Sequence, residues 1–204
     1  MKGLMLALLG VSVVASASTA QAQTGRHVAL GVGIAFHKYV DKDFSKKSPG
    51  FSLLYRLHWK PGMKQGWTLE PKAKIDWYKT DVQTSVGTVD THIGKLRSIP
   101  ALVGAGPYYR HGRTKVGVGI LAGPSFNHFT ADNSSTSITV KNSLVVRPEA
   151  SFWYDVSSRL GLHAGLSYVY DHATAETTSG GTTTSATWKT DRINFGVGFA
   201  IGII

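Results

Sequence analysis

Cysteine is absent from this chain of 204 residues. The fold therefore contains no disulfide bond, and thiolate metal sites are excluded. Acidic residues are also scarce, because 12 Asp and Glu stand against 22 Lys and Arg and leave a formal net charge of +10. Proteins that bind nucleic acid place such an excess in a basic patch, but the N-terminal export signal described next argues against that class.

Long apolar runs are missing beyond the first 22 residues. A transmembrane helix needs about 20 consecutive apolar residues, and the mean hydropathy of the chain is only −0.04. The N-terminus combines Lys2, a short apolar run over residues 4–14 and the sequence Ala20-Gln21-Ala22. These are the three parts of a secretory signal peptide. We expect residues 1–22 to be removed on export and residues 23–204 to form one domain; an uncleaved anchor helix is the alternative.

The mature sequence alternates between apolar and polar positions with the period of two that is typical of β-strands. Residues 67–78 show this most clearly, since Trp67, Leu69 and Trp77 alternate with charged side chains. Eight such segments are predicted: residues 27–37, 51–60, 67–78, 95–109, 114–126, 140–154, 159–170 and 191–204.

The connections between these segments alternate in length. Long polar connections cover residues 38–50, 80–93, 130–139 and 171–190, and short turns cover residues 61–66, 110–113 and 155–158. Outer-membrane barrels have short periplasmic turns and longer external loops. The pattern predicts an all-β fold: an eight-stranded antiparallel up-and-down transmembrane β-barrel with both chain ends on the periplasmic side. The last long connection, rich in Thr, Ser and Gly, is expected to be a mobile loop.

The polarity of the two strand faces distinguishes a membrane barrel from a soluble one. A soluble barrel points its apolar face inward. The glycines of the other face would then lie on its water-exposed surface, where they would weaken the strands. In a narrow membrane barrel the glycines make room inside the lumen. With the register reversed, Lys72 and Lys74 would face lipid at a cost of about 2–4 kcal/mol each. A soluble periplasmic barrel is therefore the weaker alternative.

Aromatic residues recur at the ends of the predicted strands, where membrane barrels carry interfacial girdles. They are Phe36, Tyr39, Phe51, Trp59, Trp67, Trp77, Tyr108, Tyr109, Phe126, Phe129, Tyr154, Tyr168 and Tyr170.

Two short motifs, Ile99-Pro100 and Ala122-Gly123-Pro124, lie on consecutive predicted strands. With them the sequence resembles the bacterial outer-membrane β-barrel domain family, and its layout is similar to small barrels of the OmpA and OmpX type. The resemblance implies location in the cell outer membrane, with outer-membrane lipid and lipopolysaccharide as partners and the barrel-assembly machinery acting during biogenesis. We expect a monomer without a cofactor or a nucleic-acid partner.

The alternation assigns a set of charged side chains to the lumen. They are Arg56, Glu70, Lys72, Lys74, Asp76, Arg147, Glu149 and Arg192, together with Arg97 from a less regular segment. Buried charges must be paired or hydrated, so we expect an ion-pair network that plugs the barrel. The basic surplus leaves a narrow channel for small anions as an alternative. A further basic group is expected at the periplasmic rim, either solvated or attracted to anionic headgroups: Lys60, Lys64, Arg110, Arg113 and Lys115.

Catalytic and metal-binding patterns are weak, since no H-x-x-x-H or H-E-x-x-H spacing occurs. The nearest candidates for a lipid A-modifying site are His128 with Thr130 and Asp132, and Asp171-His172 with Ser179. Nothing in the sequence holds a nucleophile and a base within hydrogen-bond reach. The sequence therefore predicts a non-enzymatic outer-membrane barrel that contributes to envelope integrity or surface interaction. A narrow channel and a lipid A-modifying enzyme are the alternatives.

Overall fold

The computed structural model describes residues 28–41, 43–44, 48–58, 63–86, 89–132 and 137–203. Over these residues the regular secondary structure consists of antiparallel β-strands. The strands are β1 (Val28–Tyr39), β2 (Ser48–Leu57), β3 (Gln65–Val86), β4 (Val89–His111), β5 (Thr114–Ala131), β6 (Ser137–Val140), β7 (Ser143–Asp155), β8 (Leu160–Ser179), β9 (Thr182–Lys189) and β10 (Arg192–Gly202). Among the described residues there is no helix of the length and apolarity that a membrane crossing requires.

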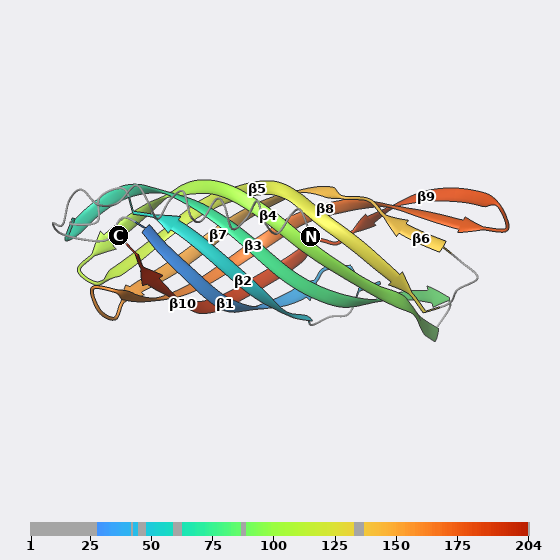
Figure 1. Cartoon of the computed structure of the whole chain (residues 1–204), viewed down its shortest axis with the longest axis horizontal. Helices are drawn as coiled ribbons and strands as arrows, with labels where there is room; N and C mark the ends of the chain where they lie inside the picture. Colours follow the sequence, from blue (N-terminus) through green and yellow to red (C-terminus); the bar gives the residue numbers. More distant parts are fainter. Residues whose placement is uncertain are drawn as a thin grey trace.

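Eight strands close into a ring in the order β10, β1, β2, β3, β4, β5, β7, β8, and the pairing of β8 with β10 completes it. Figure 1 shows these strands strongly tilted around one long axis, as a closed barrel requires. Strands β6 and β9 lie outside the ring, where both pair with the last part of β8. The described residues therefore form ten strands rather than the predicted eight, with two in a second small sheet.

The two ends of the barrel differ in their connections. At the short-turn end, Gly112-Arg113 joins β4 to β5, and β7 ends at Asp155 shortly before β8 begins at Leu160. The opposite end, the long-loop end, carries the β3–β4 and β8–β9 hairpins together with β6. Figure 1 shows β9 and β6 projecting beyond the ring at the right.

Residues 80–93 and 171–190 were predicted as polar loops; the described parts, residues 80–86, 89–93 and 171–190, instead extend the barrel as hairpins. Strand β3 continues to Val86, and β8 continues to Ser179 before β9 returns. The Thr-rich tract suits a strand because β-branched side chains pack well on a pleated surface. Gly180 and Gly181 adopt φ angles of 56° and 82°, which a two-residue hairpin turn needs. The predicted mobile loop was therefore wrong.

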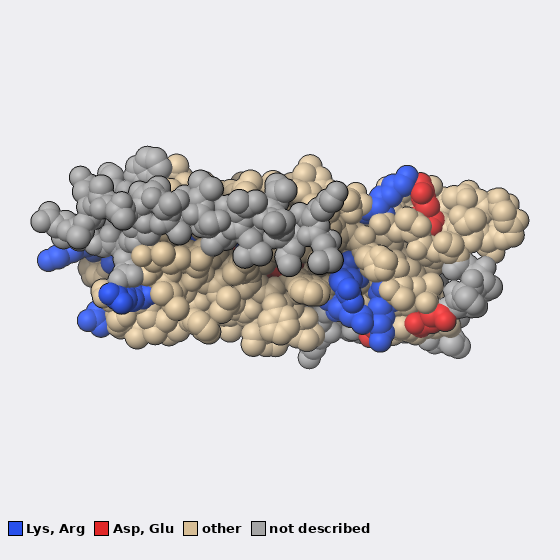
Figure 2. Space-filling model, viewed as in Figure 1, with Lys and Arg blue, Asp and Glu red and all other residues tan. Residues whose placement is uncertain are grey.

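The outer face of the ring is apolar over its middle. Large exposed side chains occupy it on every strand, among them Val32 on β1, Phe51 on β2 and Phe199 on β10. On β3 the outward positions run from Trp67 to Trp77, a rise of about 25 Å on a tilted strand, which matches the apolar band of a membrane barrel. Figure 2 shows almost no Lys, Arg, Asp or Glu on the middle of the visible surface outside the grey area.

Four residues face the opposite way from their predicted placement. Tyr39, Tyr108 and Phe129 were assigned to the girdles but are buried inside the barrel. Arg97 was assigned to the lumen but is exposed, because its neighbours Leu96 and Ser98 occupy the inward positions of β4. The predicted signal peptide, Trp59 and Lys60 lie outside the described residues.

Candidate functional site

The lumen near the short-turn end holds a buried cluster around Glu70. Arg56 donates a hydrogen bond to one carboxylate oxygen of Glu70, and Lys115 Nζ lies 3.3 Å from the other. His58 Nδ1 lies 3.2 Å from the same oxygen and 2.7 Å from Lys115 Nζ. The guanidinium of Arg56 also stacks over the ring of Tyr108 at 4.1 Å. One carboxylate therefore forms ion pairs with two cations. Their hydrogen bonds offset the cost of burying all three charges.

A second cluster continues the network toward the middle of the barrel. Lys72 donates hydrogen bonds to the Tyr108 hydroxyl and to Glu149. Glu149 also lies 3.7 Å from the Nε of Arg147, and Arg147 donates a hydrogen bond to Asp76. The chain of contacts ends at Lys74, whose Nζ is 3.8 Å from Asp76 Oδ1. These contacts join β3 to β7 across the lumen and therefore brace the ring from inside.

A third cluster lies toward the long-loop end. The guanidinium of Arg192, whose residue is 1% exposed, donates a hydrogen bond of 3.1 Å to Asp171 and one of 2.9 Å to the carbonyl of Thr190. Its central carbon Cζ lies 4.1 Å from the centroid of the Tyr78 ring. The Tyr78 hydroxyl in turn donates to Asp171 at 3.4 Å. An enclosed charge pair thus has both ionic and aromatic partners.

Glycines on the inner face make room for the large rings between these clusters, as the sequence predicted. A Cβ on Gly161 would lie 2.3 Å from the Trp153 ring, and a Cβ on Gly117 would lie 2.6 Å from the Tyr108 ring. A cavity of about 30 Å³ remains next to the second cluster, lined in part by Lys72, Lys74 and Glu149. That volume accommodates one or two water molecules, so the lumen is almost filled at this level.

Beyond the third cluster the inside of the barrel becomes apolar. The long-loop-end cluster consists of Tyr39, Phe44, Tyr78, Val82, Leu96, Phe129, Val140, Ala173 and Ala175, with Trp188 packed against it. Trp188 on β9 meets Phe44 and Phe129 edge to face, with ring centroids 6.0 and 5.4 Å apart. The hairpins of this end therefore share a hydrophobic core that closes the barrel above the charged lumen.

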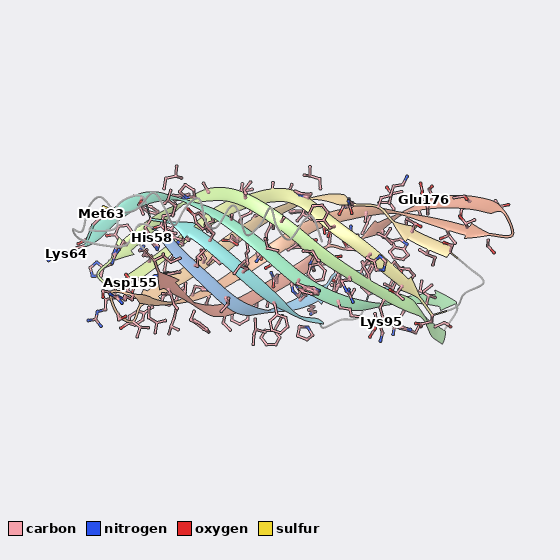
Figure 3. All side chains as sticks on the ribbon, viewed as in Figure 1. His58, Met63, Lys64, Lys95, Asp155 and Glu176 are labelled. Atoms are coloured by element: carbon pink, nitrogen blue, oxygen red, sulfur yellow. The ribbon has the colours of Figure 1, made fainter. Side chains whose placement is uncertain are left out.

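The short-turn end opens into a basic pocket. A cavity of about 260 Å³ lies there, and its lining includes His58 and the charged residues Arg110, Arg113, Lys115, Asp155 and Arg159. Arg110 pairs with Asp155 at 2.7 Å. Figure 3 labels His58 and Asp155 at this end of the barrel. The pocket attracts anions electrostatically, but Lys115 and Trp153 form its inner wall and are themselves buried.

The eight residues assigned to the lumen from the sequence all lie in the three clusters. Lys115 was predicted at the periplasmic rim; it does lie at the short-turn end, where it lines the basic pocket, but it is buried against Glu70 rather than solvated. Asp171 was missed because it directly follows the predicted end of a strand at residue 170. Both residues share the inward parity of their strands, Lys115 with Gly117 and Asp171 with Val169, so the alternation itself could have identified them.

The candidate catalytic groups are not brought together. Asp132 contacts His92 rather than His128. On β8, buried Asp171 and exposed His172 point to opposite faces, and His172 Nε2 lies 3.2 Å from Asp191. Among the described residues, no group of three or more His, Asp and Glu side chains is placed to hold a metal ion.

Comparison with known proteins points to one family. The family model for the outer membrane protein beta-barrel domain matches residues 4–200. Among solved structures, the outer membrane protein OprG of Pseudomonas aeruginosa is similar with a TM-score of 0.65 and 12% identity, over 88% of this chain and 96% of that chain. AlkL, solved in lipid bilayers, gives 0.59 and 11%, over 90% and 93%. The attachment invasion locus protein Ail of Yersinia pestis gives 0.50 and 14%, over 88% and 99%. No curated protein sequence matches the chain.

Proposed function

The chain belongs to the outer membrane protein β-barrel domain family, and we propose that it is a non-enzymatic barrel with a closed lumen that presents structured hairpins at the cell surface. The observation that carries this proposal is the filling of the lumen from the cluster around Glu70 to the long-loop end. Three ion-pair clusters occupy the level of the membrane, and the long-loop-end cluster seals the barrel above them. A barrel of eight strands leaves an interior that side chains just fill.

A role at the surface follows from the projecting hairpins. Outer-membrane barrels direct their longer connections outward, which puts β6, β9 and the β3–β4 hairpin outside the cell. These elements offer a rigid polar surface rather than loose chain, because the long-loop-end cluster packs beneath them. Such a surface suits a contribution to envelope integrity or contact with an external partner.

Planar-bilayer recording of the refolded protein tests the closed lumen. We expect no steady conductance in molar KCl, because the second cluster leaves room for only one or two water molecules. A steady open level in the wild-type protein would overturn the closed-lumen proposal.

Site-specific labelling tests the surface role, and the absence of cysteine makes each introduced thiol unique. Thr183→Cys lies on β9 and Ser158→Cys in the turn between β7 and β8; both positions are exposed. A bulky maleimide that cannot cross the outer membrane should label Thr183→Cys in intact cells. It should reach Ser158→Cys only after permeabilisation. The reverse result would contradict the proposed orientation.

The basic pocket favours a second candidate function, a narrow conduit for small anions. Arg113 and Arg159 are exposed at its mouth and would raise the local anion concentration. If the protein conducts, an Arg113→Gln/Arg159→Gln variant should lower both conductance and anion preference. Cation-selective conductance would exclude this candidate.

A further inference from the structure

The basic pocket at the short-turn end has the size of a small-molecule site. Its inner wall is formed by Lys115 and Trp153, which are each 3% exposed. Its volume of about 260 Å³ equals that of about nine water molecules at about 30 Å³ each. A single bound ion would leave most of this space empty. The volume instead approaches about 300 Å³, the lower end of the range for pockets that bind small organic ligands.

The carboxylate in this pocket is already used by the protein. Asp155, the one acidic residue among the described lining residues, accepts hydrogen bonds of 2.7 Å from Arg110 and 2.6 Å from the Trp153 indole. Arg113 and Arg159 are exposed lining residues, and within the described part of the chain neither forms an ion pair with a carboxylate. Figure 2 shows Lys and Arg side chains at this end of the barrel, at the left. The mouth of the pocket therefore keeps an excess of positive charge.

The inner wall of the pocket carries a further excess of positive charge, and this one is buried. Glu70 accepts hydrogen bonds from both Arg56 and Lys115, so two cations share one carboxylate. His58 Nδ1 lies 2.7 Å from Lys115 Nζ and adds no negative charge. A buried charge without a partner is costly, and Lys115 and His58 both line the pocket. An anion bound there would lie beside the buried ammonium group and supply the missing negative charge.

Backbone hydrogen bonds fix the two arginine positions at the mouth. The carbonyl of Arg113 accepts a bond of 2.8 Å from the amide of Asp155, and that of Arg159 accepts one of 2.8 Å from the amide of Gly202. The hydroxyl oxygen of Ser157, also in the lining, accepts bonds of 3.2 and 3.1 Å from two amides of its own turn. Its hydroxyl proton can therefore be donated to a ligand. A mouth built on a fixed backbone loses little entropy on binding.

We propose that this pocket binds a small dicarboxylate, with its two carboxylates at opposite ends of a short carbon chain. One carboxylate would pair with Lys115 at the inner wall, and the other with the planar donor groups of Arg113 and Arg159. The carbon chain between them would lie against the Trp153 ring. A ligand with both charges on one group would leave one of these two positions unpaired. The site needs no conducting lumen, so its failure would leave the closed-lumen proposal untouched.

The direct test is isothermal titration of the refolded full-length barrel, in a neutral detergent, with glutarate as the probe. We expect glutarate to bind, and to bind more weakly as KCl is raised. Butyrate, which has a single carboxylate, should bind about tenfold more weakly, since it loses one charge-assisted contact. Glycerol phosphate, which carries its charge on one group, should also bind more weakly than glutarate. If either comparison ligand binds as tightly as glutarate does, the proposal is overturned.

Two variants test the two ends of the pocket separately. Lys115→Met should weaken glutarate binding about tenfold. Arg113→Gln/Arg159→Gln should weaken it about fivefold, because exposed ion pairs contribute less than buried ones. The matched control Lys95→Gln/Arg97→Gln removes two exposed charges at the long-loop end and should bind glutarate as the wild-type protein does.

Heat-modifiable mobility on gels verifies that each variant has folded, and if Lys115→Met does not fold, the double variant at the mouth decides. The proposal is overturned if the wild-type protein does not bind glutarate, if the folded pocket variants bind it normally, or if the control loses as much affinity as they do.

Discussion

The inside of this barrel changes character between the membrane level and the long-loop end. At the membrane level it holds buried Arg, Lys, Asp and Glu, whereas at the long-loop end it holds Phe44, Val82, Leu96 and their neighbours. The inward-facing side chains of one and the same strand change from charged to apolar along its length. On β3 the inward side chain is Asp76 at the membrane level and Val82 six residues later. The outward side chain changes in the opposite sense, from Trp77 to Lys79.

The medium around the strand explains this reversal. Where lipid surrounds the barrel, apolar side chains are satisfied outside, and the polar residues must face the lumen. Where water surrounds the same strands, the hydrophobic effect puts the apolar side chains inside. The long-loop end is therefore built like a small soluble β-domain on top of a membrane barrel, and the two parts should respond differently to substitution.

The largest expected loss in the free energy of unfolding comes from removing the carboxylate that Arg56 and Lys115 share in the lumen. Glu70→Gln leaves Arg56 and Lys115 buried without a counter-charge. Breaking a buried pair in this way costs about 3–5 kcal/mol. Equilibrium unfolding in urea from lipid vesicles measures the loss.

Lys141 and Glu176 provide a matched control for this loss. They also form an ion pair, but at the long-loop end, where water reaches both side chains. Glu176→Gln should cost no more than about 1 kcal/mol. Equal losses for the two variants would show that the lumen network contributes no more than a surface pair does.

A second substitution tests the apolar part of the comparison. Leu96→Ala leaves a cavity in the long-loop-end cluster, and buried Leu→Ala changes cost about 2–5 kcal/mol. We expect the lower half of that range, with faster hydrogen exchange confined to the β3–β4 and β8–β9 hairpins. Exchange throughout the membrane-level strands would contradict the division into two parts.

Leu144→Ala is the control for this cavity. Leu144 lies on the lipid-facing side of β7 and is 71% exposed. Lipid chains occupy the space that the substitution creates, so only the transfer free energy of the side chain is lost. The backbone amide hydrogens of the hairpins at the long-loop end should then exchange at the same rates as in the wild-type protein.

The sequence was enough to predict the parity of the strands and hence the lumen residues. The alternation of Glu70, Lys72 and Asp76 with Leu69 and Trp77 states directly which side chains share a face. It could not predict which charges meet across the barrel. Lys72 and Glu149 are 77 positions apart, and their contact depends on how the ring closes.

The hairpin extensions were missed for a different reason. The prediction ended strands where apolar residues stopped facing outward, at Tyr78 and at Tyr170. Inward parity nevertheless continues through Thr80 and Val82 on β3 and through Ala173 on β8. An outward face that becomes polar was interpreted as a loop, although it marks the point at which a continuing strand leaves the lipid.

The smallest expected effect concerns a pH-sensitive contact among the hairpins. Exposed His92 on β4 contacts the carboxylate of Asp132, and its Nε2 lies 3.3 Å from Asp81 on β3. The hydrogen bond to Asp132, supported by Asp81, raises the pKa of His92 above its ordinary value. Because the folded pKa is raised, the stabilisation is fully present below about pH 6.5 and is lost as the pH rises through the folded pKa.

NMR titration of the His92 ring and exchange of the Asp132 amide, which donates to the Ile93 carbonyl at 3.1 Å, should report this loss. His92→Gln should remove the pH dependence of that exchange. His172→Gln, which affects a separate pair with Asp191 between β9 and β10, should preserve it. Solvent screens such exposed pairs strongly, so global stability should hardly change. A His92 ring that titrates below its ordinary pKa would show that the two carboxylates do not hold the charged form.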